Sequence, residues 1–172
     1  PWYEGIDEFN MMIAGDDHPA NIESNRWFFE QVYLPYLQPK GMRLVICGRL
    51  SDAMYQIFGG VSHVFYASFV EDLDDIRAFS QMAILADRVG AGISNKTIEA
   101  MSRGMAFAAT PFAMRGISDR FDGDIPMFDD PHMLALDIIR ISKNKAALNN
   151  RRELSKNIYN ELFSIEAILP KW

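Results

Sequence analysis

The sequence predicts a doubly wound α/β fold, in which helices cover both faces of a parallel β-sheet. Two observations support this: short apolar segments alternate with amphipathic helical segments along nearly the whole chain, and the connections between them are short. With 172 residues, 49% of them apolar, the chain is long enough to bury a sizeable core. We therefore expect a single domain over 1–172, with a tail at 1–8 and a C-terminal helix and tail at 145–172.

Five apolar segments are expected to form the strands of the sheet. Most are continuous apolar runs, a pattern typical of parallel strands that are buried on both faces. The segments are Phe9–Gly15, Met42–Gly48, His63–Ala67, Met82–Ala86 and Phe107–Thr110. Ile125–Phe128 is expected to add an edge strand, because Pro126 would interrupt the hydrogen bonds of a central one.

Six segments between and after these strands have helical spacing or helix start signals. They are Asn21–Leu37, Ser51–Phe58, Leu73–Phe79, the segment from Asn95 to Gly104, a helix that opens at Asp130–Pro131, and Lys145–Phe163. We expect Asn21 to cap the first helix. We expect Pro35 to kink that helix or to end it near Tyr33, because proline lacks the N–H that a helix interior needs.

The composition excludes several classes of function. A formal net charge of −6, with no cluster of lysine and arginine, speaks against a nucleic-acid partner. No apolar run reaches the roughly 18 residues of a membrane span, and no signal-peptide pattern opens the sequence. The single cysteine, Cys47, cannot form an internal disulfide and suits a reducing, cytoplasmic location. It ends an apolar run, so we expect a buried, unreactive thiol.

The segment Gly90–Thr110 carries the most specific functional signal in the chain. It begins with Gly90 and Gly92, whose backbone N–H groups are open to an anion because no bulky side chain shields them. Ser94 and Asn95 then offer an N-cap for a short helix. Free amides and the helix dipole both favour negative charge at such a helix start, so this segment predicts a phosphate site.

Lys96 and Glu99 lie in the first turn of this helix, and Gly104 ends it. In a doubly wound fold, ligands bind beyond the carboxyl ends of the strands. We therefore expect one functional rim at that edge of the sheet. The loops expected there are 15–21, 48–51, 68–72, 87–95 and 110–116.

Four landmarks along the chain carry a resemblance to a known family. They are Gly15–Asn21, with its Pro-x-Asn helix start, Arg43–Arg49, with its Gly-Arg end, Phe69–Leu73, and the Gly90–Thr110 signature with Lys96 and Glu99. Together they resemble the C-terminal, nucleotide-sugar-binding domain of GT-B glycosyltransferases of the group 1 retaining type. The resemblance covers the chain from about Phe9 to Phe163 and implies a Rossmann-like domain that forms one half of a GT-B fold.

The resemblance implies roles for the residues of a donor site. Glu99 matches the family glutamate that accepts hydrogen bonds from the ribose hydroxyls, and Lys96 is placed to meet the diphosphate. These two form the expected catalytic pair. The amides from Gly90 to Ser94 would line the path of sugar and phosphate, and backbone groups around Val70 would face the base. The implied donor-binding set is Asp16, Arg49, Val70, Gly90, Ala91, Gly92, Ile93, Ser94 and Asn95.

The implied reaction is retaining glycosyl transfer from a nucleoside-diphosphate sugar to an unknown acceptor, with no metal or cofactor. Helix N-termini and basic side chains would stabilise the charge of the leaving diphosphate. The family's acceptor-binding N-terminal domain has no counterpart in this sequence. We expect that domain to be a partner, and any membrane contact to go through it. We also expect the chain alone to be inactive. The base of the donor nucleotide, as in UDP or as in GDP, stays open.

Two departures from the family pattern favour a competing interpretation, a non-catalytic nucleotide-binding or scaffold module. Many members carry a second glutamate eight positions before Glu99, where this chain has Ala91. The basic pair that often follows the first strand is replaced by Asp16, Asp17 and His18. Lys96 is the candidate to take over its role, with Arg49 or Arg88 as helpers.

Simpler interpretations exist for several residues. Glu99 can be a first-turn carboxylate favoured by the helix dipole and paired with Lys96. Asp16 and Asp17 suggest a receiver-type phosphoacceptor, which we reject because Ser68 stands where such a domain needs an aspartate. The Asp-x-Asp pairs at 72–74 and 122–124 are expected to be helix caps or solvated charges. The three histidines have no ligand spacing that indicates a metal site.

Overall fold

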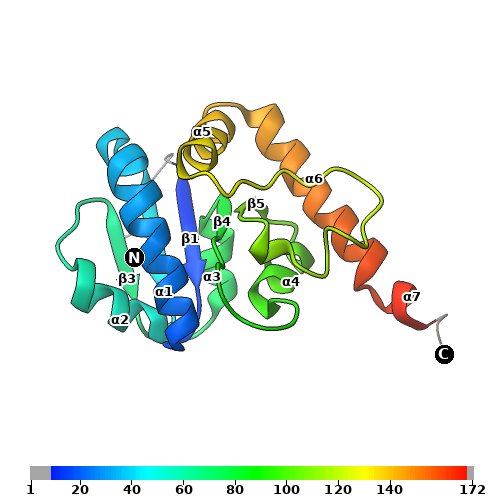
Figure 1. Ribbon diagram of the computed structural model, residues 1–172, viewed down its shortest axis with the longest axis horizontal. Helices are drawn as coiled ribbons and strands as arrows, with labels where there is room; N and C mark the ends of the chain where they lie inside the picture. The colour runs from blue at the N-terminus through cyan, green and yellow to red at the C-terminus, as the bar shows by residue number, and fades with distance from the viewer. Residues whose placement is uncertain (1–8, 170–172) are drawn as a thin grey trace.

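The computed structural model of the chain describes residues 9–169. Five parallel strands form one sheet in the order β3-β2-β1-β4-β5 (Figure 1). They are β1 (Asn10–Ala14), β2 (Arg43–Cys47), β3 (Val64–Ala67), β4 (Met82–Leu85) and β5 (Ala106–Ala109). The predicted doubly wound, Rossmann-like fold is confirmed, and the expected bounds of these five strands are each met within one residue. The predicted tail at 1–8 and the last three residues of the C-terminal tail lie outside the described residues.

The two faces of the sheet bury two separate apolar clusters. Side chains point alternately to the two faces along each strand. Met11 and Ile13 therefore join one cluster while Met12 joins the other. The parallel register pairs Met11 with Leu44 and Met12 with Val45, so neighbouring strands add to the same two clusters. Burial on both faces explains why the strands are continuous apolar runs.

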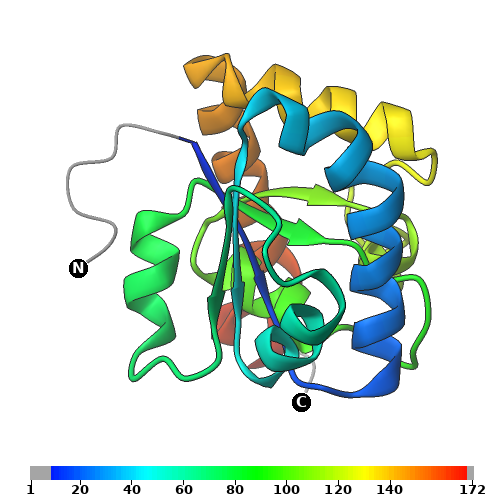
Figure 2. The ribbon, with the colours of Figure 1, turned by 90° about the vertical axis from the view of Figure 1, so that its left-hand side faces the viewer.

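Helices cover both faces of the sheet. The first face carries α1 (Pro19–Phe28), the π-helix η1 (Phe29–Leu37), α2 (Arg49–Phe58) and α5 (Pro131–Ser142). The second face carries α3 (Leu73–Phe79), α4 (Asn95–Ser102) and α6 (Lys145–Leu162). Figure 2 shows the sheet standing between α3 on one side and α1 on the other. The sequence pattern does not predict the short helices η2 (Gln38–Lys40), η3 (Phe112–Met114) and α7 (Ile165–Ile168).

β1 and β4 are neighbours in the sheet, but the chain leaves them toward opposite faces. β1 leads into α1 on the first face, whereas β4 leads through the loop 86–94 into α4 on the second. Such a divergence at the carboxyl ends of adjacent parallel strands opens a crevice in which ligands bind. The fold therefore puts the predicted functional loops on the two sides of one opening.

Of the two effects expected of Pro35, a kink or an early end, the early end does not occur. The helix does not end or break near Tyr33; α1 passes into a π-helix at Phe29, which continues to Leu37. Proline cannot donate the backbone hydrogen bond of a regular α-helix, and a wider helical turn is one way of accommodating that missing bond. Phe28 and Phe29 are both fully buried, although they are adjacent in the sequence.

The N-cap of α1 is His18, and the expectation of Asn21 in that place is wrong. The His18 ring nitrogen Nδ1 accepts the Ala20 N–H at 3.3 Å. Pro19 follows at the first helical position, where a missing N–H has no cost and the fixed φ suits a helix start. The N-cap therefore lies three residues earlier than predicted, and the Asn21 side chain is available for another partner.

The expected edge strand at Ile125–Phe128 is also wrong, because this segment forms no strand. Pro126 has no N–H to donate to a ladder. A single backbone bond, from the Phe128 N–H to Ala109 O at 2.9 Å, ties the segment to the end of β5. Asp72, in contrast, caps α3 as expected by accepting the Asp74 N–H at 2.8 Å.

Two glycines allow the ends of β1 and β2 to approach each other. Gly48 has φ +80°, and a Cβ at this position would lie 2.4 Å from Gly15 O. Gly15 O accepts the Leu50 N–H at 3.2 Å, so it cannot move away without loss of a hydrogen bond at the start of α2. Glycine is therefore required at 48 for two reasons, its backbone conformation and the lack of space.

We predict that Gly48→Ala lowers the free energy of unfolding by roughly 3 kcal/mol, the sum of a left-handed backbone and a steric clash. Gly60→Ala is the matched control, since Gly60 has φ +88° but no atom within 4 Å of the added Cβ. It should cost only about 1–2 kcal/mol, the backbone contribution alone. Urea unfolding of both variants measures the difference, and equal losses would contradict the steric role of Gly15 O.

Candidate functional site

An open cleft of about 490 Å³ lies at the carboxyl ends of β1 and β2, beside the start of α4. This volume is typical of a small-molecule site, and the position is the one that the divergence of β1 and β4 provides. The structure brings together six of the residues predicted for the donor site. These are Asp16, Arg49, Ser94, Asn95, Lys96 and Glu99.

Three helices start at the wall of this cleft. Asn21 lies in the first turn of α1, Arg49 opens α2, and Asn95 opens α4. The N-terminal end of a helix carries a partial positive charge and unpaired N–H groups. These helix starts therefore favour an anion at the wall of the cleft without depending on any one basic side chain.

The first two backbone donors of α4 have no acceptor inside the helix. Ser94 occupies the N-cap position, but its side chain makes no capping hydrogen bond. Thr97 and Ile98 both donate to Ser94 O, at 3.1 and 3.2 Å. The N–H groups of Asn95 and Lys96 therefore have no acceptor within the helix. Both residues line the cleft, where their amides can meet a ligand.

The Lys96 ammonium is held in one place by partners from two other elements. Nζ lies 2.5 Å from Asp87 Oδ1 and donates to Asn21 Oδ1 at 2.9 Å. Asn21 in turn donates from Nδ2 to Asp16 Oδ1 at 2.6 Å. The Lys96 side chain is 19% exposed, so a fixed, partly desolvated positive charge borders the cleft.

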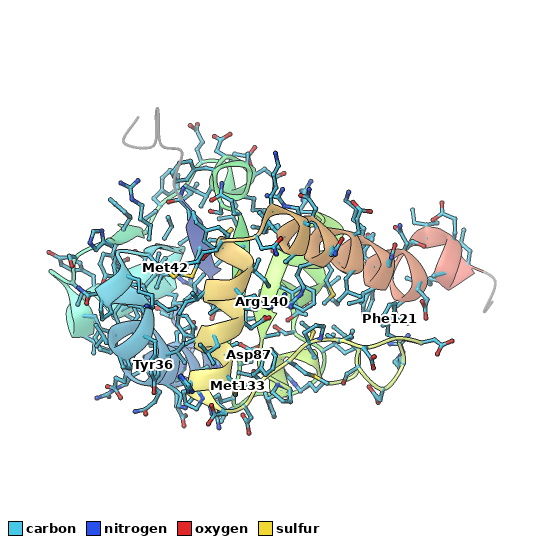
Figure 3. All side chains as sticks on the ribbon, turned by 90° about the horizontal axis from the view of Figure 1, so that it is seen from above. Tyr36, Met42, Asp87, Phe121, Met133 and Arg140 are labelled. Atoms are coloured by element: carbon cyan, nitrogen blue, oxygen red, sulfur yellow. The ribbon has the colours of Figure 1, made fainter. Side chains whose placement is uncertain are left out.

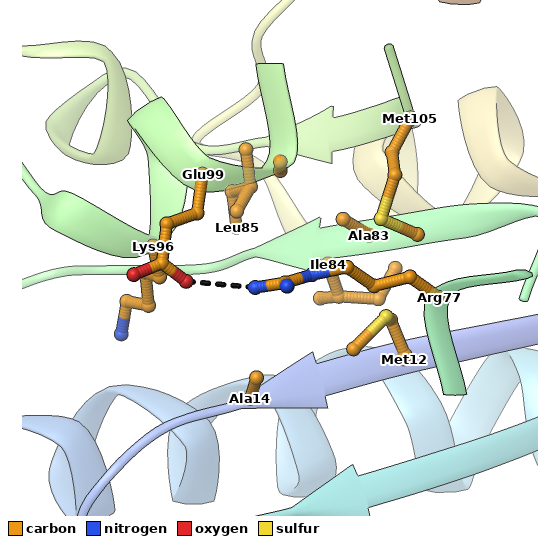
Figure 4. Close-up of a pocket in the computed structure, with 10 residues that line it drawn as sticks. Met12, Ala14, Arg77, Ala83, Ile84, Leu85, Lys96, Glu99 and Met105 are labelled. Atoms are coloured by element: carbon orange, nitrogen blue, oxygen red, sulfur yellow. Dashed lines mark hydrogen bonds and ion pairs between the residues drawn. The ribbon is translucent and has the colours of Figure 1, made fainter. Parts of the chain in front are cut away.

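Glu99 lies one turn further along α4 and has a different partner. Its Oε2 accepts a hydrogen bond from Arg77 Nη2 at 2.8 Å (Figure 4). Arg77 Nη1 also contacts Asp74 Oδ1 at 2.8 Å. The simpler interpretation that pairs Glu99 with Lys96 is therefore wrong. The Glu99 side chain is 58% exposed, so one carboxylate oxygen is oriented by Arg77 while the group remains open to solvent.

A small apolar cavity of about 20 Å³ lies behind this ion pair. Met12, Ala83, Leu85 and Met105 are among the residues that line it, together with the stems of Lys96 and Glu99 (Figure 4). A space of this size holds about one water molecule. It is too small to be the ligand site, which leaves the larger cleft as the candidate.

Carboxylates hold the other charged groups at the rim. Arg49 Nε lies 3.1 Å from Asp17 Oδ1, with both side chains largely exposed. The hydrogen bond from the His18 N–H, joined by Asn21 and Arg49, holds the pKa of the Asp16 carboxyl below its ordinary value. Asp16 therefore stays ionised at neutral pH and keeps Asn21 oriented toward Lys96.

Arg88 is directed away from the cleft. Its guanidinium stacks over the Trp27 ring at 4.1 Å and pairs with Asp129 at 2.8 Å. This arginine, one of the two candidates to help Lys96, is not among the residues that line the cleft. It instead fixes the loop 86–94 against α1.

Five residues of the predicted donor-binding set do not line the cleft: Val70, Gly90, Ala91, Gly92 and Ile93. Gly90 and Gly92 have φ of +137° and +63°, which bends the loop before α4. Val70 and Ile93 are partly buried against the second-face cluster. Phe69, next to Val70, is 86% exposed, and Leu73 from the start of α3 does reach the cleft.

Arg115, at the end of η3, holds the segment Gly90–Gly92, here called the glycine loop. Its Nη2 donates to Ala91 O at 3.3 Å, and its Nη1 donates to Phe112 O at 2.8 Å and lies 3.8 Å from Asp87 Oδ2. The guanidinium also lies over the Phe112 ring at 4.3 Å. A single arginine thus connects η3, the glycine loop and the end of β4.

Sequence reasoning missed Asp87, Arg115 and Arg77 as individual site residues. Asp87 follows the end of a buried strand, in a loop that the sequence does assign to the functional rim. A charged residue next to a buried strand is the signal that could have found it. Arg77 and Arg115 gave no such signal, because their partners Glu99 and Ala91 lie 22 and 24 residues away.

Cys47 lies at the end of β2 and is fully buried, as expected. Burial raises the pKa of its thiol to about 12, so the nucleophilic thiolate is scarce at neutral pH. Within residues 9–169, no group of three or more histidine, cysteine, aspartate or glutamate side chains could hold a metal ion. Over the same part of the chain, every helix is too short or too polar to cross a lipid bilayer.

A sequence model of a known family covers most of the chain. The family is described as glycosyl transferases group 1, and the match runs over residues 8–144. The chain belongs to the group 1 glycosyltransferases. The resemblance based on the Gly90–Thr110 signature is thereby confirmed at the level of the family. No curated protein sequence matches the chain significantly.

Solved structures share the fold of this glycosyltransferase domain at low sequence identity. TarM from S. aureus, solved as a mutant in complex with fondaparinux, alpha-GlcNAc-glycerol and UDP, matches with a TM-score of 0.70 and 16% identity, over 96% of this chain and 34% of TarM. A second TarM structure gives 0.67 and 15%, over 97% and 35%. The chain therefore spans about a third of the length of TarM.

The C-terminal domain of LpcC from Francisella tularensis, a group 1 family protein, has nearly the same extent as this chain. It matches with a TM-score of 0.62 and 12% identity, over 92% of this chain and 87% of that domain. The fold described above is therefore that of the C-terminal domain of a GT-B glycosyltransferase.

Proposed function

We propose that the cleft binds the nucleoside-diphosphate part of a sugar donor for metal-independent, retaining glycosyl transfer. The observation that carries this proposal is the joint position of the free α4 amides, Lys96 and Glu99 on one wall of the cleft. Free amides and an ammonium group suit a diphosphate, and a carboxylate one turn away suits ribose hydroxyls. The UDP found in a complex of the related TarM supports a nucleotide ligand.

In this arrangement the diphosphate lies at the N–H groups of Asn95 and Lys96, with the Lys96 ammonium beside it. Glu99 accepts hydrogen bonds from the ribose with the oxygen that Arg77 does not occupy. The exposed Phe69 ring next to Val70 offers an apolar surface for the base. Ala91 and its neighbours, which lie outside the cleft lining, face the sugar from the glycine loop.

The chemical role of these groups is to stabilise the leaving diphosphate. When the bond from the sugar to the phosphate breaks, negative charge grows on the diphosphate oxygens. The α4 dipole and Lys96 are already in place for this charge and need no reorganisation during the reaction. Asn21 and Asp87 hold the ammonium, so the leaving group meets a fixed donor and not a mobile one.

We predict that Glu99→Ala weakens UDP binding by about 1.5–3 kcal/mol, the contribution of a hydrogen bond to a charged group. Inorganic pyrophosphate, which has no ribose, should bind this variant as it binds the natural chain. Lys96→Gln should weaken both ligands. Isothermal titration calorimetry with UDP, GDP, ADP and pyrophosphate measures these differences and identifies the preferred base.

Glu153→Ala is the matched control, because Glu153 is an exposed helical glutamate on α6 that pairs only with Lys156 in the described structure. Its nucleotide affinity should equal that of the natural chain. If Glu99→Ala binds UDP as tightly as Glu153→Ala does, Glu99 has no contact with the ribose.

We expect this chain by itself to transfer no sugar, because the family's acceptor is bound by the second domain of the GT-B fold. A radiolabelled or mass-spectrometric transfer assay with the isolated chain and a panel of UDP- and GDP-sugars measures this. Product formation by the isolated chain would contradict the division of roles between the two domains.

One observation favours the competing function, a nucleotide-binding or scaffold module without catalysis. Each basic side chain near the cleft is already paired: Lys96 with Asp87, and Arg49 with Asp17. A module of this kind would bind a nucleoside diphosphate in calorimetry but show no turnover when joined to an acceptor domain. Hydrolysis or transfer of a donor sugar by the two-domain protein would exclude it.

A further inference from the structure

We propose that Asp87 is the positioning residue of the donor site, holding Lys96 on one side and, through Arg115, the glycine loop on the other. The inference rests on the proposed function, since it assigns the task of these contacts to diphosphate binding. Asp87 lies two residues after β4 and is 5% exposed. In the view from above it lies well inside the outline of the molecule (Figure 3).

The backbone at Asp87 is anchored to the sheet independently of the Asp87 side chain. The Thr110 hydroxyl Oγ1 donates to Asp87 O at 2.6 Å, and Thr110 is itself fully buried at the end of β5. This bond ties the first residues after β4 to the neighbouring strand. The carboxylate therefore projects from an anchored point of the sheet, whereas both of its cationic partners come from outside it.

The two oxygens of the carboxylate serve different elements. Oδ1 contacts Lys96 Nζ on α4, and Oδ2 lies 3.8 Å from Arg115 Nη1. Arg115 in turn holds the glycine loop, because its Nη2 donates to Ala91 O. The walls that the proposed function assigns to the diphosphate and to the sugar thus depend on one carboxylate.

A buried carboxylate beside an anion site is unfavourable by simple electrostatics, because it repels the ligand. If charge alone mattered, removal of the negative charge of Asp87 should tighten anion binding. A carboxylate at this position helps ligand binding only if its effect on the orientation of Lys96 and Arg115 outweighs its repulsion of the anion. Without it, Lys96 and Arg115 are two neighbouring cations, 19% and 23% exposed, with no carboxylate between them to hold them in place.

The decisive experiment is a double-mutant cycle of Asp87→Asn and Lys96→Gln, with calorimetric titration of UDP and inorganic pyrophosphate into the natural chain and the three variants. Asp87→Asn should weaken both ligands roughly ten-fold, the opposite of what charge removal alone predicts. UDP and pyrophosphate lack the sugar that the proposed function places at the glycine loop, so Asp87 acts on these two ligands through Lys96. The double variant should therefore bind within about two-fold of Lys96→Gln.

Glu30→Gln is the matched control, since Glu30 also pairs with an arginine, Arg26, but lies away from the cleft lining and from the loop 86–94. It should bind both ligands as the natural chain does.

If Asp87→Asn binds the ligands as tightly as the natural chain or more tightly, the proposal is overturned. Effects of the two substitutions that multiply in the double variant would overturn it as well. Asp87→Glu keeps the carboxylate and should bind more tightly than Asp87→Asn; if Asp87→Asn does not fold, loss of binding in a folded Asp87→Glu would overturn the proposal as well.

A second measurement needs no nucleotide and separates this proposal from the proposed function. Arg115→Gln should speed amide hydrogen exchange at Gly90–Gly92 in the free chain, while exchange in α6 stays unchanged. Unchanged exchange at the loop would overturn the assigned link from Asp87 through Arg115. If the natural chain binds none of the nucleotides, the proposed function fails, and the exchange result still decides whether this link orders the loop.

Discussion

The site depends on one constraint of the fold, the divergence of the chain after β1 and β4. These strands pair with each other, yet their helices cover opposite faces, and the loops between cannot close over the sheet edge. Helix N-termini border the resulting cleft, with unpaired amides at the start of α4. In the proposed function the backbone amides favour an anion, and the side chains refine that preference.

The basic side chains around the cleft are each paired with a carboxylate of the protein. Lys96 pairs with Asp87, Arg49 with Asp17, and Glu99 with Arg77. A free ammonium group would attract a phosphate more strongly, but it would also be mobile and would lose conformational entropy on binding. The pairing holds each of these basic groups in a defined orientation.

The local part of the structure could be predicted from the sequence, and the long-range part could not. The strands are predictable because residues such as Met11, Met12 and Ile13 are all apolar and the sheet buries both faces. The start of α4 is predictable from its glycines and Ser94. The pairing of Glu99 with Arg77 joins residues 22 apart, and its choice over Lys96 depends on how α3 packs beside α4. The buried pair of Arg151 and Asp137 could not be predicted either, because it too depends on how two helices, α5 and α6, pack together.

Nuclear magnetic resonance of the ¹⁵N-labelled chain, titrated with a nucleoside diphosphate, tests the central claim most directly. The account predicts that the largest chemical-shift changes fall on the backbone amides of Ser94, Asn95 and Lys96, where α4 begins at the cleft. Changes confined to another surface, such as the groove beside Arg140 and Leu136 on α5, would contradict it.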